Sequence, residues 1–318
     1  MQKIINSVLE KKYPLVNPLY RHWKNIRYGV QGLIYMLHRV DDICYDKLYP
    51  NENMKVSPAF LEKIIKRYQK EGFLFISLDQ LYEHLTSQHI LDKPFIVFTL
   101  DDGYLDNYTQ AYPVFKKYNV PFIVNITTSF PDGEALLWWY MLEDIILKND
   151  FVRLLDGEVL ECASERAKNE VFMKLRERCL KFGKEELELS LCDLFRYYPT
   201  DLYSYVKGMS MTWEQIAAMS KDPLCTIGGH TVTHPAFNRL TKDEIVWEVS
   251  RGCERLSEYI DKEIMHFAFP YGTQNEVGER ELDIMKQFDF KTIVTTRRNM
   301  ITQESDLQKL SRIMLCEL

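Results

Sequence analysis

Two acidic residues and two histidines in this chain have the types and spacing needed to bind a divalent metal. Asp101 and Asp102 directly follow the apolar run FIVFTL. His230 and His234, four residues apart, directly follow the run LCTIGG. One carboxylate and two imidazoles form a facial triad that leaves positions on the metal open for water and substrate. The second carboxylate would act as a base beside that water, so the pattern predicts metal-assisted hydrolysis.

Each feature taken alone also has a structural explanation. Adjacent acids after a strand often form turns or cap helices, and a His-x3-His pair is commonly part of an ordinary surface. The combination favours a site because both pairs follow predicted strands, and α/β folds place their active sites after strands.

Three motifs in this order resemble those of the polysaccharide deacetylases, the NodB-homology proteins of carbohydrate esterase family 4. Residues 99–103, TLDDG, resemble the first motif of that family, T-F-D-D-G. Residues 230–234, HTVTH, fit its second motif, H-[ST]-x-[ST]-H, at every position. Residues 267–272, FAFPYG, resemble the third motif through Pro270 and Tyr271. The resemblance extends from about Gly32 to the C-terminus, apart from one large insertion.

The resemblance implies a fold and a role for each motif residue. The implied fold is α/β, a distorted (β/α)7 barrel related to the TIM barrel, with a helical insertion. Asp101 would be the general base that takes a proton from a metal-bound water. Asp102, His230 and His234 would hold the metal, most often zinc, with cobalt, nickel or manganese as alternatives. The backbone N–H of Tyr271 would help to bind the oxyanion that develops during acyl transfer.

The chain departs from the family pattern in two places. The third motif usually has an arginine two residues before its proline, where this chain has Ala268. The late Leu-x-His motif that supplies the general acid of the family is also not evident. In its place residues 310–314, LSRIM, resemble the ending of a subgroup met in bacterial surface-glycan biosynthesis. We hypothesise that Arg312 replaces the missing arginine in orienting the catalytic aspartate.

His38 is the candidate for the missing general acid. It lies near the end of the predicted first strand, at the same rim as the motif residues. A protonated imidazole there could donate to the leaving amine, because its pKa is close to neutral pH. The alternative is a structural histidine that only holds a loop.

The alternation of strand and helix patterns predicts a mostly parallel sheet. Periodicity alone does not separate a closed barrel from an open sheet, and the resemblance favours the barrel. A capping box at Thr241 and Glu244 marks the start of one long helix. The predicted strands are 33–40, 73–77, 95–100, 121–126, 224–229, 265–269 and 291–295, and the predicted helices are 57–68, 78–85, 108–118, 169–180, 212–220 and 241–260.

The chain is expected to contain three parts. Residues 1–31 form an N-terminal extension, and residues 32–318 form the barrel domain, interrupted by a helical insertion at 131–210. Such an interval is too long for an ordinary strand-to-helix loop. The aromatic run WWY at 138–140, which opens the insertion, could stack on sugar rings or could anchor the insertion to the barrel.

Composition limits the partners and the location of the protein. A net charge of −6 over 318 residues disfavours a nucleic-acid partner. Seven scattered cysteines and the lack of a run of about 20 apolar residues lead us to expect a cytoplasmic protein. Residues 1–30 carry six Lys and Arg residues against Glu10 alone, interleaved with aromatic residues. They could be a peripheral arm at the inner membrane face or a solvated extension. The sequence does not predict an oligomeric state.

Together these features predict a metal-dependent hydrolase acting on C–N bonds. The expected reaction removes an N-acetyl group from a sugar of a bacterial surface polysaccharide, a lipopolysaccharide or a lipid-linked glycan intermediate. Hydrolysis of another N-acyl or C–N bond, or of an O-acetyl ester, is the first alternative. A glycan-binding pseudo-enzyme is the second, because the third-motif arginine and the late histidine are absent.

Overall fold

The structure, a computed structural model, describes residues 31–318 except 183, 195, 199–200 and 202. The basic extension predicted for residues 1–31 therefore lies, apart from residue 31, outside the described residues. Within the described part of the chain, no helix is both long and apolar enough to cross a membrane.

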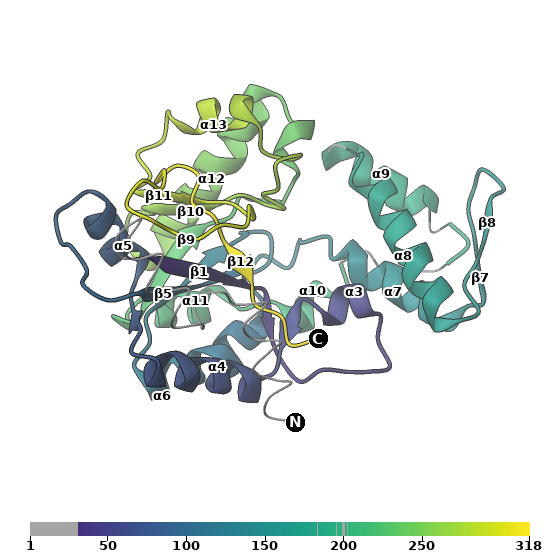
Figure 1. The fold of residues 1–318 in the computed structure, drawn as a ribbon. Coiled ribbons are helices and arrows are strands. Elements are labelled where there is room, and N and C mark those ends of the chain that lie inside the picture. Colours follow the sequence, from purple (N-terminus) through teal and green to yellow (C-terminus); the bar gives the residue numbers. More distant parts are fainter. Residues whose placement is uncertain (1–30, 183, 195, 199–200, 202) are drawn as a thin grey trace.

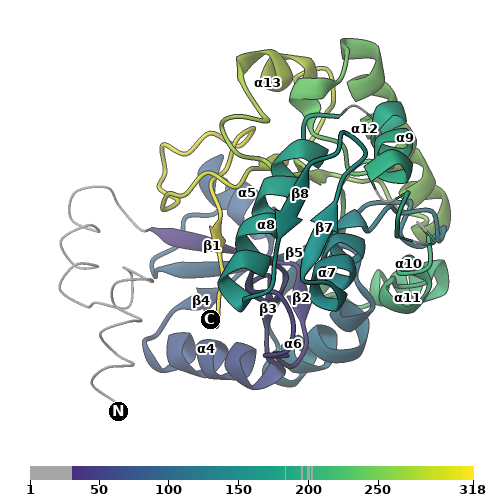
Figure 2. The same ribbon diagram turned by 90° about the vertical axis from the view of Figure 1, so that its right-hand side faces the viewer.

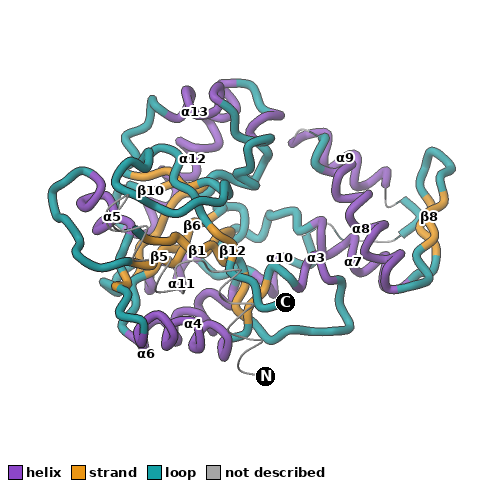
Figure 3. Tube along the Cα trace, viewed as in Figure 1, coloured by secondary structure: helices purple, strands orange, loops and turns teal. Residues whose placement is uncertain are grey.

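A sheet of eight parallel strands forms the centre of the described chain, with helices around it (Figures 1 and 3). The strand order is β11-β10-β9-β6-β5-β1-β12, and β4 lies beside the start of β5. Every residue of β5 is buried, as expected for a parallel strand that is covered on both faces. The strands are β1 (Gly32–Leu37), β4 (Leu74–Phe75), β5 (Phe95–Asp102), β6 (Phe122–Ile126), β9 (Cys225–Gly229), β10 (His266–Ala268), β11 (Thr292–Val294) and β12 (Ile313–Met314).

The sheet curls until its last strand returns to its first. Val294 at the end of β11 forms a parallel bridge with Leu310. A few residues later β12 pairs in parallel with Tyr35 and Met36 of β1. Residues 310–314 thus lie between the two edges of the sheet and bring them together. This is the distorted barrel predicted from the sequence.

Several outer helices begin at a residue that caps them, and Thr241 does so as predicted. Ser77 and Thr241 each form a capping box with the residue at the third helical position, and Ser57 caps the helix that starts with Pro58. The apolar faces of the helices that follow Ser57 and Thr241 pack on the sheet in the main hydrophobic core, whereas Leu78 and Leu81 of the helix that follows Ser77 pack in a separate cluster. The helices are α4 (Pro58–Lys70), α5 (Leu78–Leu85), α6 (Tyr112–Tyr118), α11 (Trp213–Met219), α12 (Lys242–Ile260) and α13 (Glu279–Met285), with the short turn η3 (Phe237–Arg239).

The predicted helix at 108–118 differs from the structure at its start. It begins with a π-helical turn, η2 (Asn107–Ala111), before α6. Pro113 has no N–H to donate and disfavours regular helical bonding one turn earlier. The turn also lets the Asn107 side chain donate to the carbonyl oxygen of His38 at 2.9 Å. The altered turn therefore connects this helix to the end of β1.

The predicted insertion folds as a separate group of elements beside the barrel (Figures 1 and 2). Its side chains, joined by Leu48, form a hydrophobic cluster distinct from the main core. It includes an antiparallel hairpin that the sequence analysis did not predict. The Asp156–Gly157 pair, with φ +85° at Gly157, was the available signal for that turn. The elements of this group are α7 (Trp138–Lys148), β7 (Phe151–Arg153), β8 (Val159–Glu161), α8 (Glu165–Cys179) and α9 (Lys184–Leu194). The short helix α10 (Val206–Met209) follows them, and its Val206 belongs to a different cluster that includes Tyr104 after β5.

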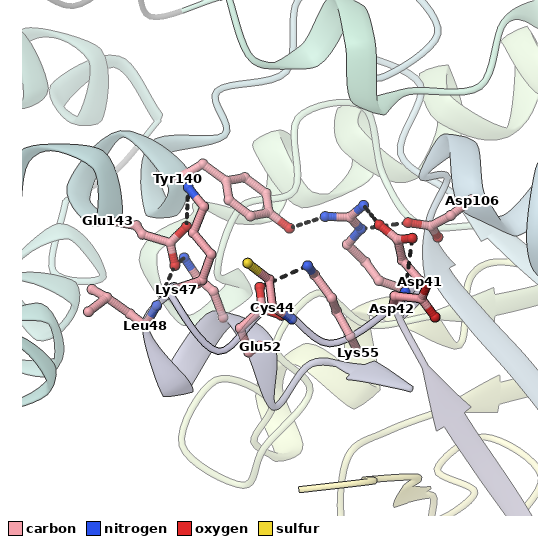
Figure 4. Close-up of polar contacts among 12 residues, drawn as sticks. Asp41, Asp42, Cys44, Lys47, Leu48, Glu52, Lys55, Asp106, Tyr140 and Glu143 are labelled. Carbon is pink, nitrogen blue, oxygen red and sulfur yellow. Dashed lines mark hydrogen bonds and ion pairs between the residues drawn. The ribbon is translucent and has the colours of Figure 1, made fainter. Parts of the chain in front are cut away.

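Polar contacts attach α7 to the segment that follows β1, which contains β2 (Arg39–Val40), α3 (Tyr49–Glu52) and β3 (Lys55–Val56). The Glu143 carboxylate accepts a hydrogen bond of 3.0 Å from the backbone N–H of Leu48 (Figure 4). The phenol of Tyr140 accepts from Arg39, whose guanidinium also lies 2.6 Å from Asp106. These contacts place the start of α7 over the carboxyl ends of the strands.

Candidate metal centre and active site

Asp102, His230 and His234 converge at the carboxyl ends of β5 and β9. Both strands flank β6, in whose register Ile126 lies opposite Asp102 on one side and Gly229 on the other. The Nε2 atoms of His230 and His234 each lie 3.3 Å from Oδ1 of Asp102. One ligand atom from each of the three residues lies within 4.8 Å of the others. The carboxylate oxygen and the two imidazole nitrogens are therefore close enough together to bind one metal ion.

The chemistry of these groups fits a divalent metal. Oδ1 of Asp102 is buried and has no hydrogen-bond partner among the described residues, although it faces both imidazoles. Nδ1 of His230 lies 2.7 Å from the carbonyl oxygen of Ala268, so we assign the imidazole proton to Nδ1. The lone pair of Nε2 is then available to bind a metal. Burial lowers the pKa of His234 to about 4, so its imidazole is neutral at pH 7. One carboxylate and two imidazoles suit zinc and related ions.

Asp101 is held by a buried arginine. Nη1 of Arg312 donates to Oδ1 of Asp101 at 2.8 Å, and Nη2 lies 2.7 Å from Oδ2. Nε of the same guanidinium donates to the carbonyl oxygen of Thr295 at 3.0 Å. Burial raises the pKa of the Asp101 carboxyl, but the charges of Arg312 and His230 outweigh this and hold the pKa well below its usual range. Arg312 therefore occupies the place that our hypothesis gave it, and Asp101 stays ionised.

Asn125 is a neighbour of Asp101 that the sequence analysis missed. It lies opposite Asp101 in the register of β5 and β6, and its Nδ2 donates to Oδ1 of Asp101 at 2.8 Å. The other side of Asn125 is closed by the next strand, where a Cβ on Gly228 would lie 2.3 Å from its Oδ1. The glycine therefore makes room for the amide. The available signal was one polar residue inside the apolar strand FIVNI.

Glu248 on α12 is a second missed residue. Its buried carboxylate accepts from the backbone N–H groups of Val232 at 2.8 Å and Thr233 at 2.9 Å. It also accepts from the Thr233 hydroxyl at 2.6 Å. These two residues lie between the histidines, so Glu248 fixes the loop that carries His230 and His234. An acid on the buried face of a predicted helix was the signal.

The backbone around the site is locally strained. Asp102, Thr231, His234 and Tyr271 all have positive φ, between +58° and +78°. Such a conformation costs a residue with a side chain about 1–2 kcal/mol and persists only where the surroundings impose it. One such restraint is the hydrogen bond of 3.0 Å from the backbone N–H of His234 to Oγ1 of Thr231. The folded structure thus forces this loop into the geometry that aims the imidazoles.

Tyr271 and His38 complete the predicted set. No group in the described part of the chain accepts a hydrogen bond from the backbone N–H of Tyr271, and the Tyr271 ring lies 4.8 Å from that of His234. His38 lies at the same rim, with a buried Nδ1 that has no described partner. Burial lowers the pKa of His38, while the charges of Asp102 and Asp101 act in the opposite direction. The structure thus brings all seven predicted site residues to one end of the barrel.

The site opens into a cavity of about 480 Å³ between the barrel and the insertion. Trp138 and Trp139 lie on the border between this cavity and a second one of about 650 Å³. Trp138 is buried and packs in the insertion core, as expected for an anchor. The Trp139 ring, with its centre 6.2 Å from that of His234, forms part of the wall. The barrel therefore supplies the reacting groups, and the insertion supplies the facing wall.

This geometry defines a parallel α/β barrel with a candidate metal site at the carboxyl ends of its strands. The family model described as polysaccharide deacetylase matches residues 186–293, which include the histidine pair and the FAFPYG run. The match supports the resemblance at the second and third motifs: over these residues the chain is similar to polysaccharide deacetylases.

Known proteins similar to this chain carry the same description. A protein of Bacillus subtilis (strain 168) named "Putative polysaccharide deacetylase YxkH" is 28% identical over 78 residues. That alignment covers 24% of this chain and 28% of the relative, so it spans about a quarter of either protein.

Two solved structures have the same fold. The deacetylase PplD of Streptococcus pyogenes, solved in complex with acetate, aligns with a TM-score of 0.60 at 18% identity, over 90% of this chain and 93% of that one. IcaB from Ammonifex degensii aligns with a TM-score of 0.59 at 18% identity, over 91% and 94%.

Proposed function

We propose that this protein is a metal-dependent deacetylase that hydrolyses the N-acetyl group of a sugar in a bacterial glycan. The observation that carries the proposal is the pair of adjacent carboxylates. Asp101 is kept ionised by Arg312, and Asp102 faces two imidazoles. The family match and the fold shared with deacetylases support the same reaction class.

Asp102, His230 and His234 would hold the cation, with zinc favoured and cobalt, nickel or manganese as alternatives. When bound, such an ion polarises the acyl carbonyl and lowers the pKa of water toward about 7.

The other residues of the site would move protons and stabilise charge. Asp101 takes the proton of the attacking water, while Arg312 and Asn125 hold its carboxylate in place. The N–H of Tyr271 donates to the developing oxyanion, an interaction typically worth about 3–4 kcal/mol. His38 is the candidate donor of a proton to the leaving amine. Burial lowers its pKa and so disfavours the protonated form, which supports its alternative role of holding the loop after β1.

The experiment that tests the proposal combines metal loading with acetate release. The purified protein is stripped with a chelator, reloaded with each of the four metals and assayed on N-acetylated sugars and lipid-linked glycans. D101N should bind metal with little change but release acetate about 10²–10⁴-fold more slowly. H234A should lose metal affinity as well.

The same assay separates the alternatives. Acetate release from O-acetylated sugars alone would indicate an esterase. Glycan binding with neither metal uptake nor acetate release would indicate the pseudo-enzyme, and the proposal would then be wrong.

We also propose a cytoplasmic location, with residues 1–30 contacting the inner face of the membrane. The excess of cationic and aromatic residues in that segment supports this proposal. Flotation with anionic liposomes should retain the full chain and lose a chain that lacks residues 1–28. Equal flotation of both would contradict membrane contact through this segment.

A further inference from the structure

Helix α8 of the insertion presents one arginine to the cavity that contains the candidate site. Arg176 lines this cavity together with Asp101, Asp102 and the two histidines. The guanidinium therefore lies on the wall that faces the reacting groups.

Arg176 differs from the other cationic residues of α8 in having no partner among the described residues. Lys174 lies 2.5 Å from Glu158, which also pairs with Arg178, and Arg166 pairs with Glu170 one turn later. The ammonium group of Lys168 donates to backbone carbonyl oxygens at the end of α7. No side-chain hydrogen bond or ion pair joins Arg176 to any described residue. The cation that points into the cavity is therefore the one left uncompensated.

The carboxylates in the same cavity are already engaged. Asp101 is bound by Arg312, and Asp102 faces the imidazoles. Glu276 accepts a hydrogen bond from the Thr273 hydroxyl. None of these acids forms an ion pair with Arg176, so its guanidinium is an unpaired cation in the wall of this cavity.

We propose that Arg176 is a specificity residue that binds an oxyanion, a carboxylate or a phosphate, on the sugar or next to the group that is deacylated. The inference rests on the proposed function and names its substrate class: an anionic, N-acylated glycan. A guanidinium offers a planar fork of donors that matches carboxylate and phosphate oxygens. In a partly enclosed cavity such a contact is stronger than on an open surface.

The test compares three probes that share one N-acetylated sugar. These are N-acetylglucosamine, which is neutral, N-acetylglucosamine 1-phosphate and N-acetylmuramic acid. Their dissociation constants are measured by calorimetry on the full zinc-loaded chain and on its R176M and R176K variants. R178M is the matched control, because Arg178 lies on the same helix and pairs with Glu158.

We expect R176M to weaken binding of at least one acidic probe by about tenfold or more, with no change for the neutral probe. R176K should retain part of the preference, because it keeps the charge without the fork. R178M should leave all three constants unchanged. The acidic probe that responds identifies phosphate or carboxylate as the anion.

Equal effects of R176M on all three probes, or none, would overturn the inference. If thermal melting shows that R176M does not fold, the salt dependence of probe binding to the wild-type protein still tests the inference. Its preference for an acidic probe must fall as salt is added, and a salt-independent constant or no preference would overturn the inference.

The proposed deacetylase function is tested separately from the role of Arg176. It would be wrong if no substrate released acetate, whatever the binding preference. Equal rates of acetate release from neutral and acidic substrates in wild-type and R176M would leave the function standing and remove the role of Arg176.

Discussion

The barrel rim and the insertion hold their charged groups in different ways. At the rim, Arg312 and Asp101 are both buried and pair through two contacts. In the insertion, Glu158 pairs with Lys174 and Arg178 at a partly exposed surface. Buried pairs lose much when one partner is removed, whereas exposed pairs contribute little. The rim is therefore built to hold reacting groups rigidly, while the insertion can change its charged residues at low cost in stability.

The two regions also have separate hydrophobic cores. The main core joins the barrel strands to their covering helices, and a second cluster lies among the helices and hairpin of the insertion. The insertion contacts the segment after β1 through polar groups such as Glu143 and Tyr140. The strands that lead to the candidate metal site and the helices of the facing wall therefore belong to different hydrophobic cores.

The largest expected effect comes from removing the buried arginine. R312M leaves the Asp101 carboxylate buried without its partner and should lower the free energy of unfolding by about 3–5 kcal/mol. Urea denaturation measures the loss. The double variant D101N/R312M should recover part of it, because both charges are then gone. A loss no larger than that of R178M in the insertion would contradict the contrast between the two regions.

A smaller loss is expected from the loop that carries the histidines. E248A leaves the buried N–H groups of Val232 and Thr233 without an acceptor and should cost about 2 kcal/mol or more. It should also weaken zinc binding, because the strained loop loses a restraint. E248Q keeps an acceptor oxygen, so it should retain most of the stability and most of the zinc affinity. Calorimetric zinc titration and urea denaturation check this, and unchanged zinc affinity in E248A would refute the positioning role.

The pH dependence of the free energy of unfolding tests whether the Asp101 carboxyl at the barrel rim is ionised and paired. Because the pKa of Asp101 in the folded protein is depressed, its contribution to stability is present above its unfolded pKa of about 3.9 and is lost as pH falls below it. The difference in unfolding free energy between wild type and D101N should therefore narrow below about pH 4. A constant difference from pH 7 to pH 3 would contradict an ionised, paired Asp101.

The labelling rates of two buried thiols, one in the insertion and one in the barrel, measure how readily each region opens. Burial raises the pKa of Cys179, in the insertion, to about 12, and it also raises that of Cys225 in β9. Both should resist iodoacetamide at pH 8 while exposed Cys44 reacts. If the insertion opens by itself, Cys179 should be labelled about tenfold faster than Cys225. Labelling followed by mass spectrometry measures both, and equal rates would show that the two cores open together.

Several parts of this molecule were predictable because their signals are local. The residue pattern predicted α5 and α12 to within a residue, with a capping box as an additional signal for α12. The strands that precede the motifs put Asp101, Asp102 and the histidines at one rim. The hairpin β7–β8 and the π-turn before α6 were missed. The hairpin depends on a short turn and the π-turn on one proline. Neither feature changes the apolar periodicity on which the prediction was based.

The residues that hold the reacting groups were harder to find. Asn125 and Glu248 lie far from the motifs along the chain, and each contacts the site only because a neighbouring strand or helix packs there. Arg312 was proposed from a resemblance, and its contacts with Asp101 depend on the sheet curling until residues 310–314 reach β1.

The sequence by itself determined which residues are the candidate metal ligands and the candidate base, because these residue types and their spacing are local features of its motifs. The tertiary structure decided how that chemistry is held and what faces it. Hydrogen bonds to Asp101, the strained backbone at His234 and the unpaired Arg176 all arise between elements distant in sequence. Such contacts exist only after the sheet has curled and the insertion has packed, since local propensity contains no information about which distant surfaces meet.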